Sequence, residues 1–206
     1  MVAREETRPG TGAPGEPAQF AAAVATMLTA RLRPEVFCER MPAPQRIAPY
    51  AGALSADVTV DDTEVGTGRL ILLHDPDGND AWAGGTFRCV AYARAEIDVE
   101  LVTDPMLGAV GWTWLTDALE AHGAAYTAAS GTVTRVATES FGGMAEEEGT
   151  AQLEIRASWT PVLPEDADVS AHVEAWGELL CTTAGLPPVP EGVAVMPSRR
   201  GQRGPA

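Results

Sequence analysis

The sequence contains no lysine, so all 14 of its basic residues are arginine. Cysteine is also scarce: Cys38, Cys89 and Cys181 lie far apart and form no Cys-x-x-Cys pair. An odd number of widely spaced cysteines excludes a disulfide framework and the common zinc-binding spacings.

No run of 18 apolar residues occurs, so no transmembrane helix is expected. The first residues lack the apolar stretch of a secretory signal, and we therefore expect a cytoplasmic protein.

Motifs of the common enzyme classes are missing as well. The sequence has no Gly-x-Ser-x-Gly elbow, no phosphate-binding Gly-x-x-x-x-Gly-Lys loop and no Gly-x-Gly-x-x-Gly pattern. The histidines His74, His122 and His172 are not spaced as metal ligands. We therefore expect no catalytic residue, no cofactor and no metal that a local motif would reveal. An enzyme assembled from distant residues stays open, with His74, His122, Cys89 and the loop 75–80 as candidates.

Negative charge is what the chain has in excess. Its 29 acidic residues against 14 arginines give a net charge of −15. This charge is unevenly placed: residues 57–191 have a net charge of −19, residues 1–56 of +1 and residues 192–206 of +3. A body this negative is expected to repel nucleic acid and anionic membranes, which proteins bind by neutralising phosphate groups. The charge favours solubility and predicts a basic or extended protein segment as partner.

Composition divides the chain into three regions. Residues 1–16 are rich in glycine, proline and glutamate and are predicted to be disordered. Residues 17–185 contain the hydrophobic patterns of a single α+β domain. Residues 186–206 are rich in proline, glycine and arginine and are predicted to form a loose tail.

Hydrophobic periodicity predicts three helices and five strands within the domain. Apolar residues that recur every three to four positions predict helices over 17–32, 104–123 and 168–184. In the second helix, Asp104 is the expected N-cap and Pro105 the first helical residue. Alternating and short apolar runs predict strands over the ranges 56–61, 68–74, 86–102, 131–141 and 150–160.

The predicted order, αβββαββα, favours an antiparallel sheet, because short turns join most neighbouring strands. Helices are expected to cover one face of this sheet and to leave the other in solvent. The range 86–102 is long for one strand, so we expect a bend or a bulge near 91–95. The connector 34–54 contains four prolines and is predicted to be extended, irregular and packed on the core.

A candidate partner surface comes from one strand and one helix. Glu96, Asp98 and Glu100 alternate with apolar residues, which places three carboxylates on one face of the third predicted strand. They form an acidic strip for a cationic partner, a carboxylate cluster for acid–base chemistry, or a solvated sheet face paired with neighbouring arginines. Trp112 and Trp114 point about 200° apart on the second helix, so one is expected in the core. We name Glu96, Asp98, Glu100 and Trp112 as the candidate surface.

The segment Asp75-Pro-Asp-Gly-Asn-Asp80 offers several oxygen ligands for Ca²⁺ or Mg²⁺. It departs from the EF-hand pattern, because its glycine is in the fourth position and no closing glutamate follows. A polar turn between two strands is the preferred interpretation.

Several strings identify a family. They are Arg33-Pro-Glu-Val36, Pro42-Ala-Pro-Gln-Arg-Ile-Ala-Pro-Tyr50, Leu73-His-Asp-Pro-Asp-Gly78, Gly111-Trp-Thr-Trp-Leu115, Ala118-Leu-Glu-Ala-His-Gly123 and Gly131-Thr-Val-Thr-Arg135. With these strings the chain resembles, over residues 17–200, an uncharacterised actinobacterial domain-of-unknown-function family of the DUF3000 type. The resemblance implies an actinobacterial source and no assigned activity, so no functional residue is carried over.

The element order and the acidity are also similar to those of type III secretion chaperones and the related YbjN-like proteins. This second resemblance implies a small, non-enzymatic, often dimeric protein that holds extended partner segments. We therefore expect a non-enzymatic protein-binding or chaperone-like function, with a homodimer as one expected assembly. The alternative is an enzyme with a spatially assembled site.

Overall fold

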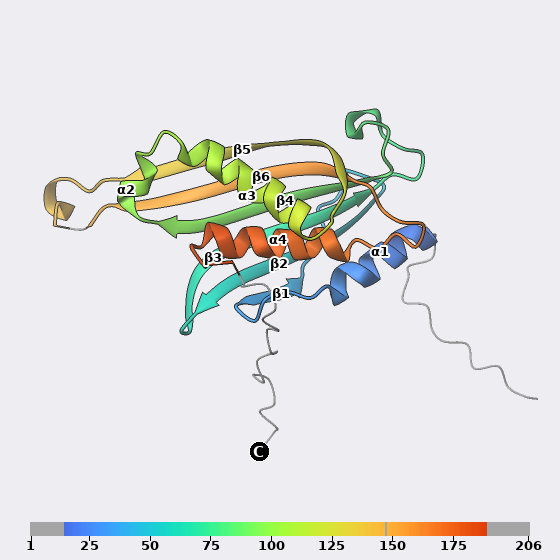
Figure 1. The fold of residues 1–206 in the computed structure, drawn as a ribbon, viewed down its shortest axis with the longest axis horizontal. Helices are drawn as coiled ribbons and strands as arrows, with labels where there is room; N and C mark the ends of the chain where they lie inside the picture. Colours follow the sequence, from blue (N-terminus) through green and yellow to red (C-terminus); the bar gives the residue numbers. More distant parts are fainter. Residues whose placement is uncertain (1–14, 147, 189–206) are drawn as a thin grey trace, which may run out of the picture.

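The computed structural model describes residues 15–146 and 148–188 of the 206-residue chain. Within these residues, one antiparallel sheet of six strands runs in the order β1-β2-β3-β4-β6-β5 (Figure 1). The strands are β1 (Val36–Arg40), β2 (Tyr50–Val60), β3 (Thr63–His74), β4 (Phe87–Ile97), β5 (Tyr126–Thr138) and β6 (Thr150–Pro161). The α-helices are α1 (Ala18–Thr29), α2 (Val99–Val102), α3 (Leu107–Ala121) and α4 (Ser170–Thr183). The predicted α+β class, the antiparallel sheet and the β5–β6 hairpin are confirmed.

The connector 34–54 is more regular than predicted. Residues 36–40 form the edge strand β1, which pairs with β2, and β2 itself already begins at Tyr50. The prolines at positions 42, 44 and 49 lie between these two strands, where the sheet needs no backbone N–H. Proline is excluded from the ladder but does not prevent strands on either side of it. The five-strand prediction therefore missed one strand.

The predicted strand 86–102 is too long. β4 ends at Ile97, and residues 99–102 form the short helix α2, a single turn that is too brief to show a helical period in the sequence. β4 pairs without a register shift on both sides, so there is no β-bulge near 91–95. Helix α3 begins at Leu107 instead of position 104, and Asp104 accepts a hydrogen bond from the Met106 N–H at 2.8 Å.

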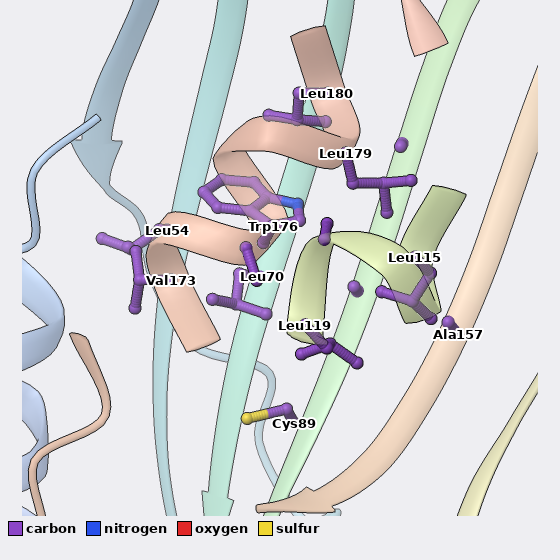
Figure 2. Close-up of a cluster of buried hydrophobic side chains, with 14 of the residues drawn as sticks. Leu54, Leu70, Cys89, Leu115, Leu119, Ala157, Val173, Trp176, Leu179 and Leu180 are labelled. Atoms are coloured by element: carbon purple, nitrogen blue, oxygen red, sulfur yellow. The ribbon is translucent and has the colours of Figure 1, made fainter. Parts of the chain in front are cut away.

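Helices α1, α3 and α4 cover one face of the sheet, and the hydrophobic core lies between them and the strands (Figures 1 and 2). Trp176 of α4 is completely buried, and its indole N–H donates to the Tyr92 carbonyl at 3.3 Å. Small residues on the strands allow this close approach: a Cβ at Gly68 would collide with Leu180 of α4. The buried side chains drawn in Figure 2 include Leu54, Leu70, Cys89, Leu115, Leu119, Ala157, Val173 and Leu179.

Side-chain alternation turns a second set of residues to the opposite face of the sheet. On β4, Cys89, Ala91 and Ala93 are buried towards the helices, whereas Val90, Tyr92 and Arg94 point the other way. No described helix covers this second face, which we call the open face. No helix of the described chain is long and apolar enough to cross a membrane.

Candidate binding groove on the open sheet face

The open face is hollowed into a groove of about 700 Å³ that extends over β3, β4, β6 and β5. We call it the open-face groove. It is lined by Thr67, Arg69, Ile71, Val90, Ala91, Tyr92, Arg94, Ser130, Gly131, Thr132, Arg156, Ala157 and Ser158. A volume of this size is in the range of ligand-binding sites in proteins.

A row of three side chains crosses the floor of the groove. Arg69 of β3 stands directly opposite Tyr92 of β4, and Tyr92 stands opposite Arg156 of β6. The Arg156 guanidinium carbon lies 5.4 Å from the centre of the Tyr92 ring, within the range of a cation–π contact. Strand pairing therefore places a cation, an aromatic ring and a second cation side by side.

The arginines of the groove are held to different degrees. Arg94 donates to Gln152 at 2.7 Å, and Arg156 forms a 3.2 Å ion pair with Glu154. The Arg156 side chain is nevertheless 65% exposed, which leaves much of its guanidinium open to a ligand. Arg69 is exposed, and the described residues offer it no ion-pair partner. Two cations are therefore available to a molecule in the groove.

The electrostatic character of the groove is opposite to that of the whole chain. Its lining includes three arginines and no carboxylate, although acidic residues outnumber basic ones by 29 to 14. Glu154 and Glu96 lie on the same face of the sheet, towards one end, and Asp57 accepts a hydrogen bond of 3.1 Å from the lining residue Thr67, so carboxylates at the rim partly offset this charge. Burial, and then the charge of the nearby Glu154 carboxylate and its hydrogen bond with the phenol, raise the pKa of Tyr92, so the phenol stays neutral with Glu154 as its acceptor.

A fourth arginine lies beneath the other end of the groove. The Arg88 side chain on β4 is buried and donates to the Ala128 carbonyl at 2.9 Å and to the Thr160 hydroxyl at 3.0 Å. It also donates to Ser158 at 2.7 Å and to Ser130 at 3.4 Å, and both serines line the groove. Burial lowers the pKa of Arg88. All four partners are neutral.

The four residues named from the sequence as a partner surface do not share one face of a strand. Glu96 is exposed on the open face near the end of β4, whereas Asp98 precedes α2 and Glu100 lies within it. The strand face that would have aligned the three carboxylates is missing, because β4 ends before Asp98. Trp112 packs on the helix-covered face, where a Cβ at Gly131 would lie 2.7 Å from its ring.

The expected core packing of the tryptophans of α3 is confirmed: both Trp112 and Trp114 pack against the core. Each is only half-buried, so neither is fully buried as one of them was expected to be.

Of the four groups of the enzyme alternative, His74 directly precedes the loop 75–80, whose Asp75 carboxylate acts on its pKa, whereas His122 and Cys89 have other surroundings. His74 is buried, bonds to the Thr86 carbonyl at 2.9 Å and stacks on Phe87. His122 lies 3.7 Å from the Glu174 carboxylate on α4. Cys89 is completely buried, and burial raises the pKa of its thiol, which disfavours a reactive thiolate.

The loop 75–80 closes on itself as a turn, in which the Gly78 N–H donates to the Asp75 carbonyl at 3.0 Å. The described residues contain no group of three or more His, Cys, Asp or Glu side chains that could hold a metal ion.

His172 is the most strongly perturbed histidine. It is 2% exposed in α4, and its Nδ1 accepts a hydrogen bond of 3.1 Å from the Trp159 indole N–H. Burial lowers the pKa of His172 to about 4, and the nearby Asp168 carboxylate offsets only part of this shift. The ring is therefore neutral near neutral pH and holds α4 against β6 as a structural group.

With the fold and groove described, the chain can be placed in a family. The model of the family described as "Protein of unknown function (DUF3000)" matches residues 16–194. The chain belongs to this family, as the sequence strings indicated. Comparison with curated proteins and comparison with solved structures both give no match.

Proposed function

We propose that this protein is a non-enzymatic, chaperone-like binding protein that holds an extended acidic segment of a partner protein in the open-face groove. One observation carries the proposal: three arginines and no carboxylate line the groove of a chain that has more than twice as many acidic as basic residues. A lining of one sign in a surface of the other sign selects its partner by charge.

The shape of the groove favours an extended segment. Neighbouring strands are about 4.8 Å apart, so the four strands span about 14 Å, the length of about four extended residues. Arg69 and Arg156 are two strands apart, with Tyr92 between them. Two acidic side chains on one side of an extended segment can reach both guanidinium groups. An apolar neighbour can contact Tyr92 or the adjacent Ile71 and Val90.

Type III secretion chaperones perform the role proposed here, because they also hold extended segments. A likeness in fold between them and this chain is part of the proposal. A basic partner, predicted from the net charge, would have to bind outside the groove lining. The homodimer and the cytoplasmic location stay predictions.

Two labelled peptides test the proposal. A rhodamine-labelled peptide of alternating glutamate and valine is expected to bind saturably in fluorescence anisotropy and to weaken as salt is added. A glutamine–valine peptide of the same length is the matched control and is expected to bind at least about tenfold more weakly, because charge-assisted hydrogen bonds are lost. The net negative charge of the protein by itself disfavours binding of the glutamate peptide, so tighter binding of this peptide has to come from the arginines of the groove. Equal affinity for the two peptides, or no binding of the first, would contradict the proposal.

A further inference from the structure

Arg88 is a buried cation without a negative partner. The residue is 7% exposed, and each of its four hydrogen-bond acceptors is a carbonyl or a hydroxyl. No described carboxylate forms an ion pair with it. Isolated buried charges are costly, and proteins normally pair them. A negative charge supplied from outside the chain would resolve this imbalance.

Two hydroxyl groups connect Arg88 to the groove. Ser130 and Ser158 each accept a hydrogen bond from the same Arg88 nitrogen, Nη2, and their oxygens are 3.4 Å apart. Both serines line the groove above the guanidinium. A hydroxyl that accepts from a cation keeps its own proton for donation. One of the two hydroxyls donates to the other across their 3.4 Å contact, which is near the limit of hydrogen-bond length, so a ligand that replaces this contact finds two O–H donors polarised by the Arg88 charge.

The backbone of β5 is distorted to build this arrangement. The pairing of β5 with β6 shifts register between Thr127 and Ser130, which is a β-bulge. Within the bulge, Ala128 has a φ of 50°, in the left-handed region that a residue with a Cβ seldom occupies. The Ala128 carbonyl is one of the groups that bind Arg88. Bulges and unusual backbone angles of this kind concentrate at functional sites.

We propose that the Ser130–Ser158 end of the groove is an oxyanion site, where a carboxylate or phosphate group of the ligand accepts from both hydroxyls and balances the charge of Arg88. The inference rests on the proposed function and deepens it: the anion is the anchor of the bound segment, and Arg69 and Arg156 hold the rest. Glu154 and Glu96 lie at the opposite end of this face, so they leave the anchor site free of repulsion.

Small anions test the site directly. In NMR spectra of the ¹⁵N-labelled protein, sodium acetate or inorganic phosphate is titrated against sodium chloride at constant ionic strength. The Arg88 side-chain resonances and the Ser130 and Ser158 amides are expected to shift saturably with one anion or both. Saturation with acetate alone identifies a carboxylate site, and saturation with phosphate alone identifies a phosphate site. Shifts that are linear in all three salts would overturn the inference.

A double variant provides the matched comparison. In Ser130→Ala/Ser158→Ala, the anion affinity is expected to fall at least about tenfold, because two hydrogen bonds to a charged group are removed. Arg88→Lys keeps the charge and should retain part of the affinity, whereas Arg88→Met should abolish it. Circular dichroism checks that each variant is folded. If the folded serine variant binds anions as the wild type does, the oxyanion site is wrong.

The glutamate–valine peptide separates the two proposals. If the peptide binds and the serine variant leaves its affinity unchanged, the anchor is wrong while the proposed function stands. If small anions saturate the site but the peptide does not bind, the oxyanion site exists and the segment-binding function is wrong.

Discussion

Replacing both Arg69 and Arg156 with glutamate is expected to weaken binding of the glutamate–valine peptide roughly 30- to 100-fold. The two arginines lie on either side of Tyr92 and are exposed, so each contributes about 0.5 to 0.7 kcal/mol to a contact with a carboxylate, and reversal adds comparable repulsion at each position. Because both side chains point into solvent and not into the core, the variant should stay folded. Fluorescence anisotropy of the labelled peptide measures the loss.

The matched control is Arg31→Glu/Arg46→Glu, which changes the net charge by the same amount. Arg31 and Arg46 are exposed and do not line the groove. This control should lower peptide affinity only slightly, through long-range repulsion that salt screens. If the control weakens binding as much as the groove variant does, the peptide responds to overall charge, and the groove is not its site.

Acidification from about pH 7 to about pH 4 is expected to lower the free energy of unfolding by about 3 kcal/mol through His172. Its pKa is about 4 in the folded protein and 6.5 in the absence of burial. Between these values the unfolded chain binds a proton that the folded protein does not. The contribution of His172 is therefore complete above pH 6.5 and is lost as the pH falls towards 4. Urea denaturation at the two pH values measures it.

The variant His172→Asn isolates this effect, because the amide oxygen can still accept the Trp159 indole hydrogen bond but does not titrate. Its unfolding free energy should fall less on acidification than that of the wild type. His74 gives a remaining decrease of the same sign, since burial lowers its pKa too. An equal pH dependence in the variant and the wild type would show that His172 is not buried and neutral in the fold.

Local patterns predicted most of the fold. The long helices and the strands 68–74 and 150–160 were recovered, because each spans enough residues to show its period. The errors lie where a sequence pattern is short or fits a strand and a helix equally well. β1 was not predicted, because the prolines around it indicated an irregular connector. The single-turn helix α2 was predicted as a continuation of β4, because an alternation of polar and apolar residues this short fits a strand as well as a helical turn.

The groove depended on information that no local pattern contains. Alternation along 87–94 could have placed Arg88, Tyr92 and Arg94 on one face of β4, opposite the small buried residues. The row from Arg69 to Arg156 exists only because β4 pairs with β6, a strand that follows β5 in the sequence. The bulge in β5 that brings Ser130 beside Arg88 could not be predicted from the sequence either, because it is a feature of strand pairing.

The central claim is that the open face of the sheet binds a partner, and chemical-shift mapping tests it most directly. Unlabelled glutamate–valine peptide is added to the ¹⁵N-labelled protein, and the shifted amides are located on the fold. Shifts are expected along the open-face groove in β3, β4, β6 and β5, with α1 and the outer surface of α3 unchanged. Shifts confined to the helices, or to the strand edges outside the groove, would contradict it.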